Sequence, residues 1–234
     1  MKVAIIGYGK MGKAIEEILL ERGHQIVCKL NAPPTEKDLE DAEVAIEFSN
    51  PEAAFNNIKT LLNNNIPTIS GTTGWLEHLE EIRALNERQK SAFLYASNFS
   101  LGVNLFFELN AYLAKLMAKY PEYQTSIEEI HHTQKLDKPS GTAITLAETM
   151  LENNALTHWE SDEKSSEDAL PIYSKRIDEI PGTHEVTYQS KIDEIRISHI
   201  AHSRKGFAMG AVLAAEWIVN KQGFFSMKDV LNLD

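Results

Sequence analysis

The strongest chemical signal in this sequence is a cluster of two histidines and a lysine within five residues. These are His131, His132 and Lys135, in the run EIHHTQKLDKPSGT at residues 129–142. Histidine titrates near neutral pH and commonly donates a proton in catalysis, while lysine adds a positive charge. The pattern indicates a site that binds an anionic small molecule and protonates it.

The Pro-Ser-Gly-Thr sequence at residues 139–142 predicts the start of a helix. Ser140 is a residue type that caps helices, which leaves the backbone N–H groups of Gly141 and Thr142 for an anion. On a regular strand His131 and His132 would point to opposite faces, so the alternative is one core and one surface histidine. A zinc site is not expected, because further ligands at suitable spacing are absent nearby.

A second chemical signal lies near residue 10, where glycines follow a short apolar run. The spacing G-x-G-x-x-G between a predicted strand and helix is typical of a loop that binds the pyrophosphate of a dinucleotide. The alternative is a simple glycine turn. The predicted loop consists of Gly7, Tyr8, Gly9, Lys10, Met11 and Gly12.

Two further loops follow predicted strands of the same unit. In an open α/β sheet, ligands bind beyond the carboxyl ends of the strands, so these loops are predicted near the nicotinamide. The alternative is that they are small-residue connections. Their residues are Gly71, Thr72 and Thr73 after one strand, and Ala96, Ser97, Asn98 and Phe99 after the next.

The choice between NADH and NADPH depends on the residue after the second strand. An acid there would bind the ribose hydroxyls and repel a 2′-phosphate, but this chain has Asn31, with Lys29 two residues earlier. An amide can bind a hydroxyl without that repulsion. The sequence is therefore compatible with either NADH or NADPH as the cofactor.

The elements that must position these loops follow from hydrophobic periodicity. Strands at 2–6, 25–30, 44–48, 66–70 and 92–96 alternate with helices at 10–22, 51–64 and 76–90. This alternation predicts α/β architecture with a Rossmann-like, doubly wound parallel sheet. Helices at 101–119 and 141–152, with strands at 123–131, 172–178, 183–190 and 194–201, predict a second, α+β unit with an antiparallel or mixed sheet, followed by a helix at 206–220.

We therefore expect two domains with hinges near Asn98 and Arg204. Residues 1–98 and 204–234 form the predicted dinucleotide-binding domain, and residues 99–203 the substrate-binding and oligomerisation domain. The polar, acidic segment 157–168 is interpreted as a solvated loop.

Composition limits the function classes. The net charge of −11 argues against nucleic acid, and no apolar stretch approaches the length of a membrane span. The sequence MKVAIIGYGKMG lacks the features of a signal peptide, and the single cysteine excludes an intrachain disulfide. We expect a soluble, cytoplasmic protein.

The order GYGKMG, GTTG, ASNFSLGVN and E-x-HH-x-x-K-x-D-x-PSGT resembles the 4-hydroxy-tetrahydrodipicolinate reductase family, also called dihydrodipicolinate reductases. The resemblance covers nearly the whole chain, and the histidine–lysine element is its most specific part. It implies that His131 is the proton donor/acceptor and Lys135 a proton donor, with Lys135 also binding substrate. His132, Ser140, Gly141 and Thr142 match substrate-carboxylate contacts. Asn31 falls where many members have an acid, and the segment 175–179 looks divergent.

The resemblance further implies NADH- or NADPH-dependent reduction of a cyclic imine dicarboxylate in diaminopimelate and lysine biosynthesis, no metal, and a homotetramer. Two alternatives remain. One is another two-domain NAD(P) enzyme, such as an aspartate or homoserine dehydrogenase, which would not need the HH-x-x-K-x-D-x-PSGT element. The other is a nucleotide-sensing module without catalysis, which would not need two histidines and a lysine beside a helix start.

Overall fold

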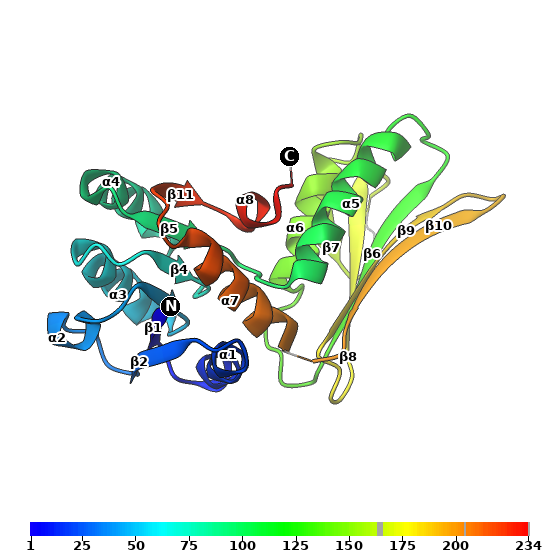
Figure 1. Ribbon diagram of the computed structural model, residues 1–234. Helices are drawn as coiled ribbons and strands as arrows, with labels where there is room; N and C mark the ends of the chain where they lie inside the picture. Colours follow the sequence, from blue (N-terminus) through cyan, green and yellow to red (C-terminus); the bar gives the residue numbers. More distant parts are fainter. Residues whose placement is uncertain (163–165, 204, 234) are drawn as a thin grey trace. The chain divides into compact units, whose positions relative to one another are not determined.

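The computed structural model describes residues 1–162, 166–203 and 205–233 (Figure 1). The chain divides into two compact units. Unit 1 comprises Met1–Leu101 and Arg204–Asp234, and unit 2 comprises Gly102–Ser203. The hinge expected near Arg204 lies outside the described residues.

Unit 1 contains a parallel sheet, as predicted, but it has six strands where five were predicted. Its order is β11-β5-β4-β3-β1-β2. The chain runs from β1 to the edge strand β2 and then returns to β3 on the other side of β1, so the switch point of the topology lies between β1 and β3. The strands are β1 (Lys2–Ile6), β2 (Gln25–Leu30), β3 (Val44–Glu47), β4 (Thr68–Ser70), β5 (Ala92–Tyr95) and β11 (Gly223–Phe225).

Helices cover both faces of this sheet, because its strands are apolar on both sides. Ile15 and Ile18 of α1 share one core with Val212 of α7, while Ile58 of α3 and Ile82 of α4 belong to another. Asn50 caps α3 by accepting the N–H of Ala53 at 2.9 Å. The helices are α1 (Lys10–Glu21), α2 (Glu36–Leu39), α3 (Pro51–Asn63), α4 (Leu79–Gln89), which a 3₁₀ turn (Leu76–His78) precedes, α7 (Lys205–Ile218) and α8 (Met227–Leu231).

Unit 2 is built on a mixed, five-stranded sheet in the order β10-β9-β6-β8-β7. The central strand β6 pairs parallel with β8 and antiparallel with β9. Two helices, α5 (Leu101–Met117) and α6 (Gly141–Leu151), pack their apolar residues on one face of this sheet. The strands are β6 (Gln124–His131), β7 (His158–Ser161), β8 (Ala169–Arg176), β9 (Gly182–Gln189) and β10 (Glu194–Ala201).

The interpretation of segment 157–168 as a loop was wrong in part. Residues His158–Ser161 form β7, which pairs parallel with the start of β8. Trp159 packs against the core of unit 2, so this one apolar contact and the backbone pairing outweigh the polar composition. Residues 163–165 of the segment lie outside the described residues. The short elements α2, β11 and α8 were also not predicted.

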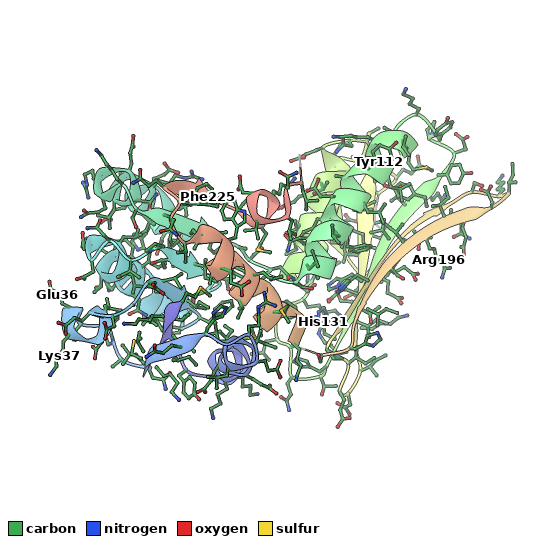
Figure 2. The ribbon with its side chains drawn as sticks, viewed as in Figure 1. Glu36, Lys37, Tyr112, His131, Arg196 and Phe225 are labelled. Carbon is green, nitrogen blue, oxygen red and sulfur yellow. The ribbon has the colours of Figure 1, made fainter. Side chains whose placement is uncertain are left out.

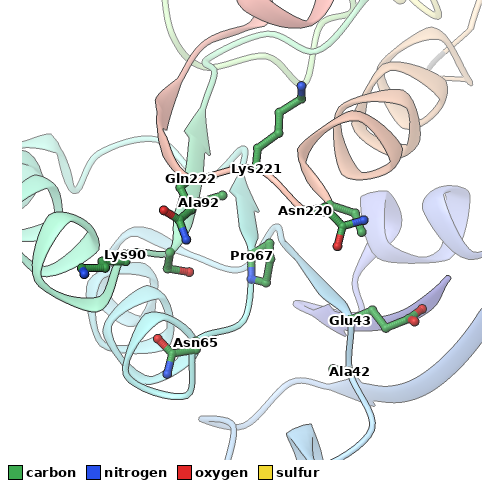
Figure 3. A pocket seen from close by; sticks show the side chains of 11 residues that line it. Ala42, Glu43, Asn65, Pro67, Lys90, Ala92, Asn220, Lys221 and Gln222 are labelled. Carbon is green, nitrogen blue, oxygen red and sulfur yellow. The ribbon is translucent and has the colours of Figure 1, made fainter.

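A shallow pocket in unit 1 lies at the amino ends of the strands. Pro67 precedes β4, Lys90 and Ser91 precede β5, and Gln222 precedes β11 (Figure 3). The glycine loop follows the carboxyl end of β1, so this pocket is at the opposite end of the sheet from it. In the described part of the chain, no helix is long and apolar enough to cross a bilayer.

Candidate active site

Two positions in the glycine loop require glycine on steric grounds. Gly7 follows β1 with φ +93°, and a Cβ there would lie 2.0 Å from the carbonyl oxygen of Phe48. A Cβ on Gly12 would lie 2.3 Å from the carbonyl oxygen of Gly7. The first glycine therefore lets the loop pass the end of β3, and the third lets α1 start against the turn.

The middle glycine has a different environment. A Cβ on Gly9 would meet no atom of the protein within 4 Å. Gly9 is the N-cap of α1, no side chain caps this helix, and its first turn has no acidic residue. The first N–H groups of a helix lack intrahelical acceptors and carry partial positive charge. The open space and these donors fit a pyrophosphate at the start of α1.

Asn31 holds the glycine loop directly. Its Oδ1 accepts the N–H of Tyr8 at 2.7 Å, which leaves the Nδ2 donors as the group that can reach a ribose hydroxyl. Lys29 Nζ lies 3.0 Å from Glu16 Oε1 and 4.9 Å from the centre of the Tyr8 ring. Lys29 is therefore neutralised by a carboxylate beside this loop.

A buried carboxylate, Glu47, joins the loops that follow β3 and β4. It accepts the N–H and hydroxyl of Ser49, the hydroxyl of Ser70 at 2.7 Å and that of Thr72 at 3.0 Å. Gly71 lies against Phe48, whose ring a Cβ at that position would approach to 2.2 Å. Of the predicted Gly71-Thr72-Thr73 set, Thr72 is buried in this network while Thr73 is exposed.

The loop after β5 is also divided between core and surface. Phe99 is buried, its ring lies 5.4 Å from that of Phe48, and its carbonyl oxygen would be 1.7 Å from a Cβ on Gly210. Asn98 Oδ1 accepts the N–H of Ser100 at 2.9 Å. Ala96 is half-buried and Ser97 exposed, so these two are more accessible to a ligand than Phe99.

In unit 2, strand β6 ends at His131, which is 7% exposed (Figure 2). Its Nδ1 contacts Oε2 of Glu129. Oε1 of the same fully buried carboxylate accepts a hydrogen bond from Nη1 of Arg176 at 2.9 Å. Burial raises the pKa of Glu129, but hydrogen bonds from His131, Ser174 and Arg176 outweigh burial and lower the pKa to about 2. Glu129 is therefore ionised at neutral pH and holds the imidazole.

The other imidazole nitrogen, Nε2, faces Gly182 of β9. A Cβ at that position would lie 3.1 Å from it. The absence of a side chain at Gly182 therefore leaves space beside the nitrogen that Glu129 does not hold.

The predicted lysine is paired with the aspartate of its own loop. Lys135 Nζ lies 2.8 and 2.7 Å from the two carboxylate oxygens of Asp137. Burial raises the pKa of Asp137, and Lys135 outweighs this and lowers it. Lys138 contacts Asp162 at 2.8 Å instead. Of the two lysines, Lys135 is the less exposed at the side chain, with 23% against 43%.

The helix α6 begins as predicted. Ser140 is its N-cap and accepts the N–H of Ala143 at 3.2 Å, while the same hydroxyl lies 3.0 Å from Nε2 of His184. A Cβ on Gly141 would meet no atom within 4 Å. The buried Ser140 hydroxyl therefore stabilises the start of the helix, and the space in front of Gly141 is open to an anion.

Several residues described above were not predicted as site residues: Glu47 in unit 1 and, in unit 2, Glu129, Asp137, Arg176, Gly182 and His184. Glu129 lies inside the run at residues 129–142, and its position two before His131 puts it on the same face of β6. Arg176 and His184 are remote in sequence and reach the site only because β8 and β9 flank β6. The segment 175–179, which looked divergent, contains Arg176.

Glu129, His131 and His184 offer ligand atoms within 4.8 Å of one another. The carboxylate is already bound to the imidazole of His131 and to the guanidinium of Arg176, a fixed cation. This arrangement is a hydrogen-bonded acid–base cluster.

Comparison with known proteins also divides the chain near residue 100, although the second part includes the final helices that the structure places in unit 1. Residues 1–99 match the family profile described as dihydrodipicolinate reductase, N-terminus, and residues 102–231 match the one described as dihydrodipicolinate reductase, C-terminus. The chain belongs to the dihydrodipicolinate reductase family. As a member of this family it is an oxidoreductase, and its N-terminal unit implies a nicotinamide dinucleotide cofactor.

Relatives in this family match along the full length. A 4-hydroxy-tetrahydrodipicolinate reductase from Christiangramia forsetii is 55% identical, covering 99% of this chain and 98% of the relative. One from Archaeoglobus fulgidus is 32% identical, covering 99% and 100%. Dipicolinate-bound dihydrodipicolinate reductase from Paenisporosarcina sp. TG-14 shares the fold with a TM-score of 0.78, at 24% identity and 100% and 99% coverage.

Proposed function

We propose that this dihydrodipicolinate reductase family member reduces 4-hydroxy-tetrahydrodipicolinate, by way of dihydrodipicolinate, to tetrahydrodipicolinate in diaminopimelate and lysine biosynthesis. The observation that carries the proposal is the acid–base cluster beside the open start of α6, in a chain that is 55% identical to a reductase of that name. The cofactor supplies a hydride when it is bound, and the protein must then supply a proton.

His131 is the proposed proton donor. Hydride addition to a conjugated C=C–C=N system moves an electron pair toward the ring nitrogen, and the resulting delocalised anion takes up one proton to give the reduced imine. Glu129 holds His131 by Nδ1 and so directs Nε2 toward the space beside Gly182. A carboxylate on one ring nitrogen fixes the orientation of the imidazole.

The substrate carboxylates need cations and N–H donors. Lys135 supplies a cation, and the first N–H groups of α6 at Gly141 and Thr142 supply donors at a positive helix end. Asp137 pairs with Lys135 and restrains its position. We assign His132 to the same substrate carboxylates, and Lys135 additionally assists the proton transfer. Ser140 acts by starting the helix.

We further propose that unit 1 binds the cofactor through the glycine loop, Asn31 and the loops after β4 and β5, and that it accepts both NADH and NADPH. Gly9 leaves room for the pyrophosphate, and Asn31 offers amide donors without a charge that would repel a 2′-phosphate. Substrate binding belongs to residues 99–203, and dinucleotide binding to residues 1–98 and 204–234.

We propose a cytoplasmic homotetramer assembled through the sheet of unit 2. The helices α5 and α6 cover one face of that sheet, and Tyr173 and Ile200 are 39% and 56% exposed on the other. Two large exposed side chains on a face without helices of its own unit support an interface with other copies.

The proposed function is tested by following NADH or NADPH oxidation after adding freshly formed 4-hydroxy-tetrahydrodipicolinate. We expect substrate-dependent oxidation that pyridine-2,6-dicarboxylate, a planar dicarboxylate, inhibits competitively. His131→Gln should lower kcat by roughly 10²–10⁴-fold with little change in the KM for cofactor. Aspartate or homoserine in place of the substrate separates the other dehydrogenases, and no oxidation with any of these would support a sensing module.

A further inference from the structure

A single guanidinium connects both proposed catalytic residues. Arg176 is the last residue of β8 and stands opposite His131 in the parallel register of β6 and β8. Its Nη1 donates to Glu129 Oε1 at 2.9 Å, its Nη2 to the carbonyl oxygen of Asp137 at 2.7 Å, and its Nε lies 3.3 Å from the carbonyl oxygen of Lys135. Arg176 thus contacts the carboxylate that holds His131 and the backbone that carries Lys135.

The segment between β6 and α6 depends on such contacts, because it has no regular secondary structure between residues 132 and 140. The carbonyl oxygens of Lys135 and Asp137 accept hydrogen bonds from Arg176. Within the segment, one backbone hydrogen bond is formed, from the N–H of Lys135 to the carbonyl oxygen of His132. The position of the Lys135 backbone relative to Glu129 is therefore set largely by a side chain from the neighbouring strand.

We propose that Arg176 is a positioning residue: it holds His131, through Glu129, and the backbone of Lys135 in one fixed arrangement. This inference rests on the proposed function, because it assumes that His131 and Lys135 act on the substrate. The rigid, planar guanidinium matches the task, since it directs several N–H donors to acceptors in fixed directions. A lysine ammonium has a similar charge but cannot hold the same three acceptors at once.

The groups that face Arg176 make removal of its charge costly as well. Glu129 is fully buried, and its remaining partners would be His131 and Ser174. Without Arg176, the buried carboxylate of Glu129 would lack its cation, which is energetically unfavourable. The Lys135–Asp137 pair remains, but the carbonyls of both residues lose their donor.

The test compares Arg176→Lys and Arg176→Ala with the wild type in the oxidation assay, with Arg22→Ala as the matched control. Arg22 also pairs with a carboxylate, Glu216, at 2.8 and 2.9 Å, but it lies in unit 1 away from the glycine loop. We expect Arg176→Lys to lower kcat by about 10²-fold, since small misplacements of catalytic groups have effects of this size. The KM for cofactor should be unchanged, and Arg22→Ala should behave as the wild type.

Added guanidinium should restore at least ten-fold activity to Arg176→Ala and none to the control. Retention of kcat within two-fold by Arg176→Lys would overturn the proposal. So would a variant that loses only its affinity for pyridine-2,6-dicarboxylate, which would make Arg176 a direct ligand contact. Loss of the wild-type far-UV circular dichroism by both variants would make it a folding residue instead. Failure of the proposed function is distinguishable, because the wild type itself would then be inactive with the substrate.

Discussion

The buried imidazole of His184 should make unit 2 sensitive to acid. His184 is 4% exposed on β9, where its Nε2 contacts the Ser140 hydroxyl. Burial, with the neighbouring His131 as a smaller cause, lowers the pKa of His184 from 6.5 to about 3. The folded state therefore holds this residue neutral over a pH range in which the unfolded chain binds a proton.

The sign and size follow from linkage. Because the folded pKa is lowered, the contribution of His184 to stability is complete above pH 6.5 and is lost as the pH falls toward 3. A pH of 5 lies 1.5 units below the pKa of 6.5 in the unfolded chain. At roughly 1.4 kcal/mol per unit, the free energy of unfolding is therefore about 2 kcal/mol lower at pH 5 than at pH 7. Glu129, with its pKa of about 2, adds a further loss only below its ordinary value of 4.5.

The perturbation is His184→Gln, which keeps a polar group near Ser140 but does not titrate. The unfolding free energy of unit 2 would be measured at pH 7 and pH 5 by native-state amide exchange in β9, corrected for the intrinsic rate at each pH. The variant should lose about 2 kcal/mol less than the wild type between these two pH values, whatever its stability at pH 7. His202→Gln, at an exposed position of the same unit, should match the wild type. An equal loss in His184→Gln and the wild type would refute the reasoning.

Three further predictions concern activity. Gly182→Ala places a Cβ 3.1 Å from His131 Nε2 and should lower kcat by about ten-fold or more without changing the KM for cofactor. Steady-state kinetics check this prediction. An unchanged kcat would mean that the reaction does not use the space beside Nε2. Asn31→Asp should shift the ratio of the kcat/KM values for the two cofactors toward NADH by roughly ten-fold, because a charged contact contributes about 1–3 kcal/mol. An unchanged ratio would mean that this side chain does not contact the ribose. Lys135→Ala should raise the KM for substrate and lower kcat together, whereas His132→Ala should act mainly on KM; a Lys135→Ala enzyme with wild-type values for both would remove the lysine from the site.

The local features of this protein follow from its residue types and their spacing. The strand, the three glycines and the helix after them could be read from spacing. Gly7 and Gly12 lie too close to neighbouring backbone for a Cβ, and Gly9 leaves open space at the start of α1. Ser140 was identified as a helix cap, since capping depends on residues three apart. The alternation of apolar strands with amphipathic helices was enough for the parallel sheet of unit 1.

The contacts that hold the site, in contrast, come from strands that meet only in the folded chain. Arg176 and His184 are far from His131 in the chain, and the order β9-β6-β8 brings them to it. The burial of Glu129 and the pairing of Lys135 with Asp137 likewise depend on packing around β6. Residues 158–161 show the same limit, because they join a sheet only when β8 is present as a partner. Charges and hydrogen bonds between remote elements leave no periodic trace in a sequence, since their energies arise only when the fold excludes water from them.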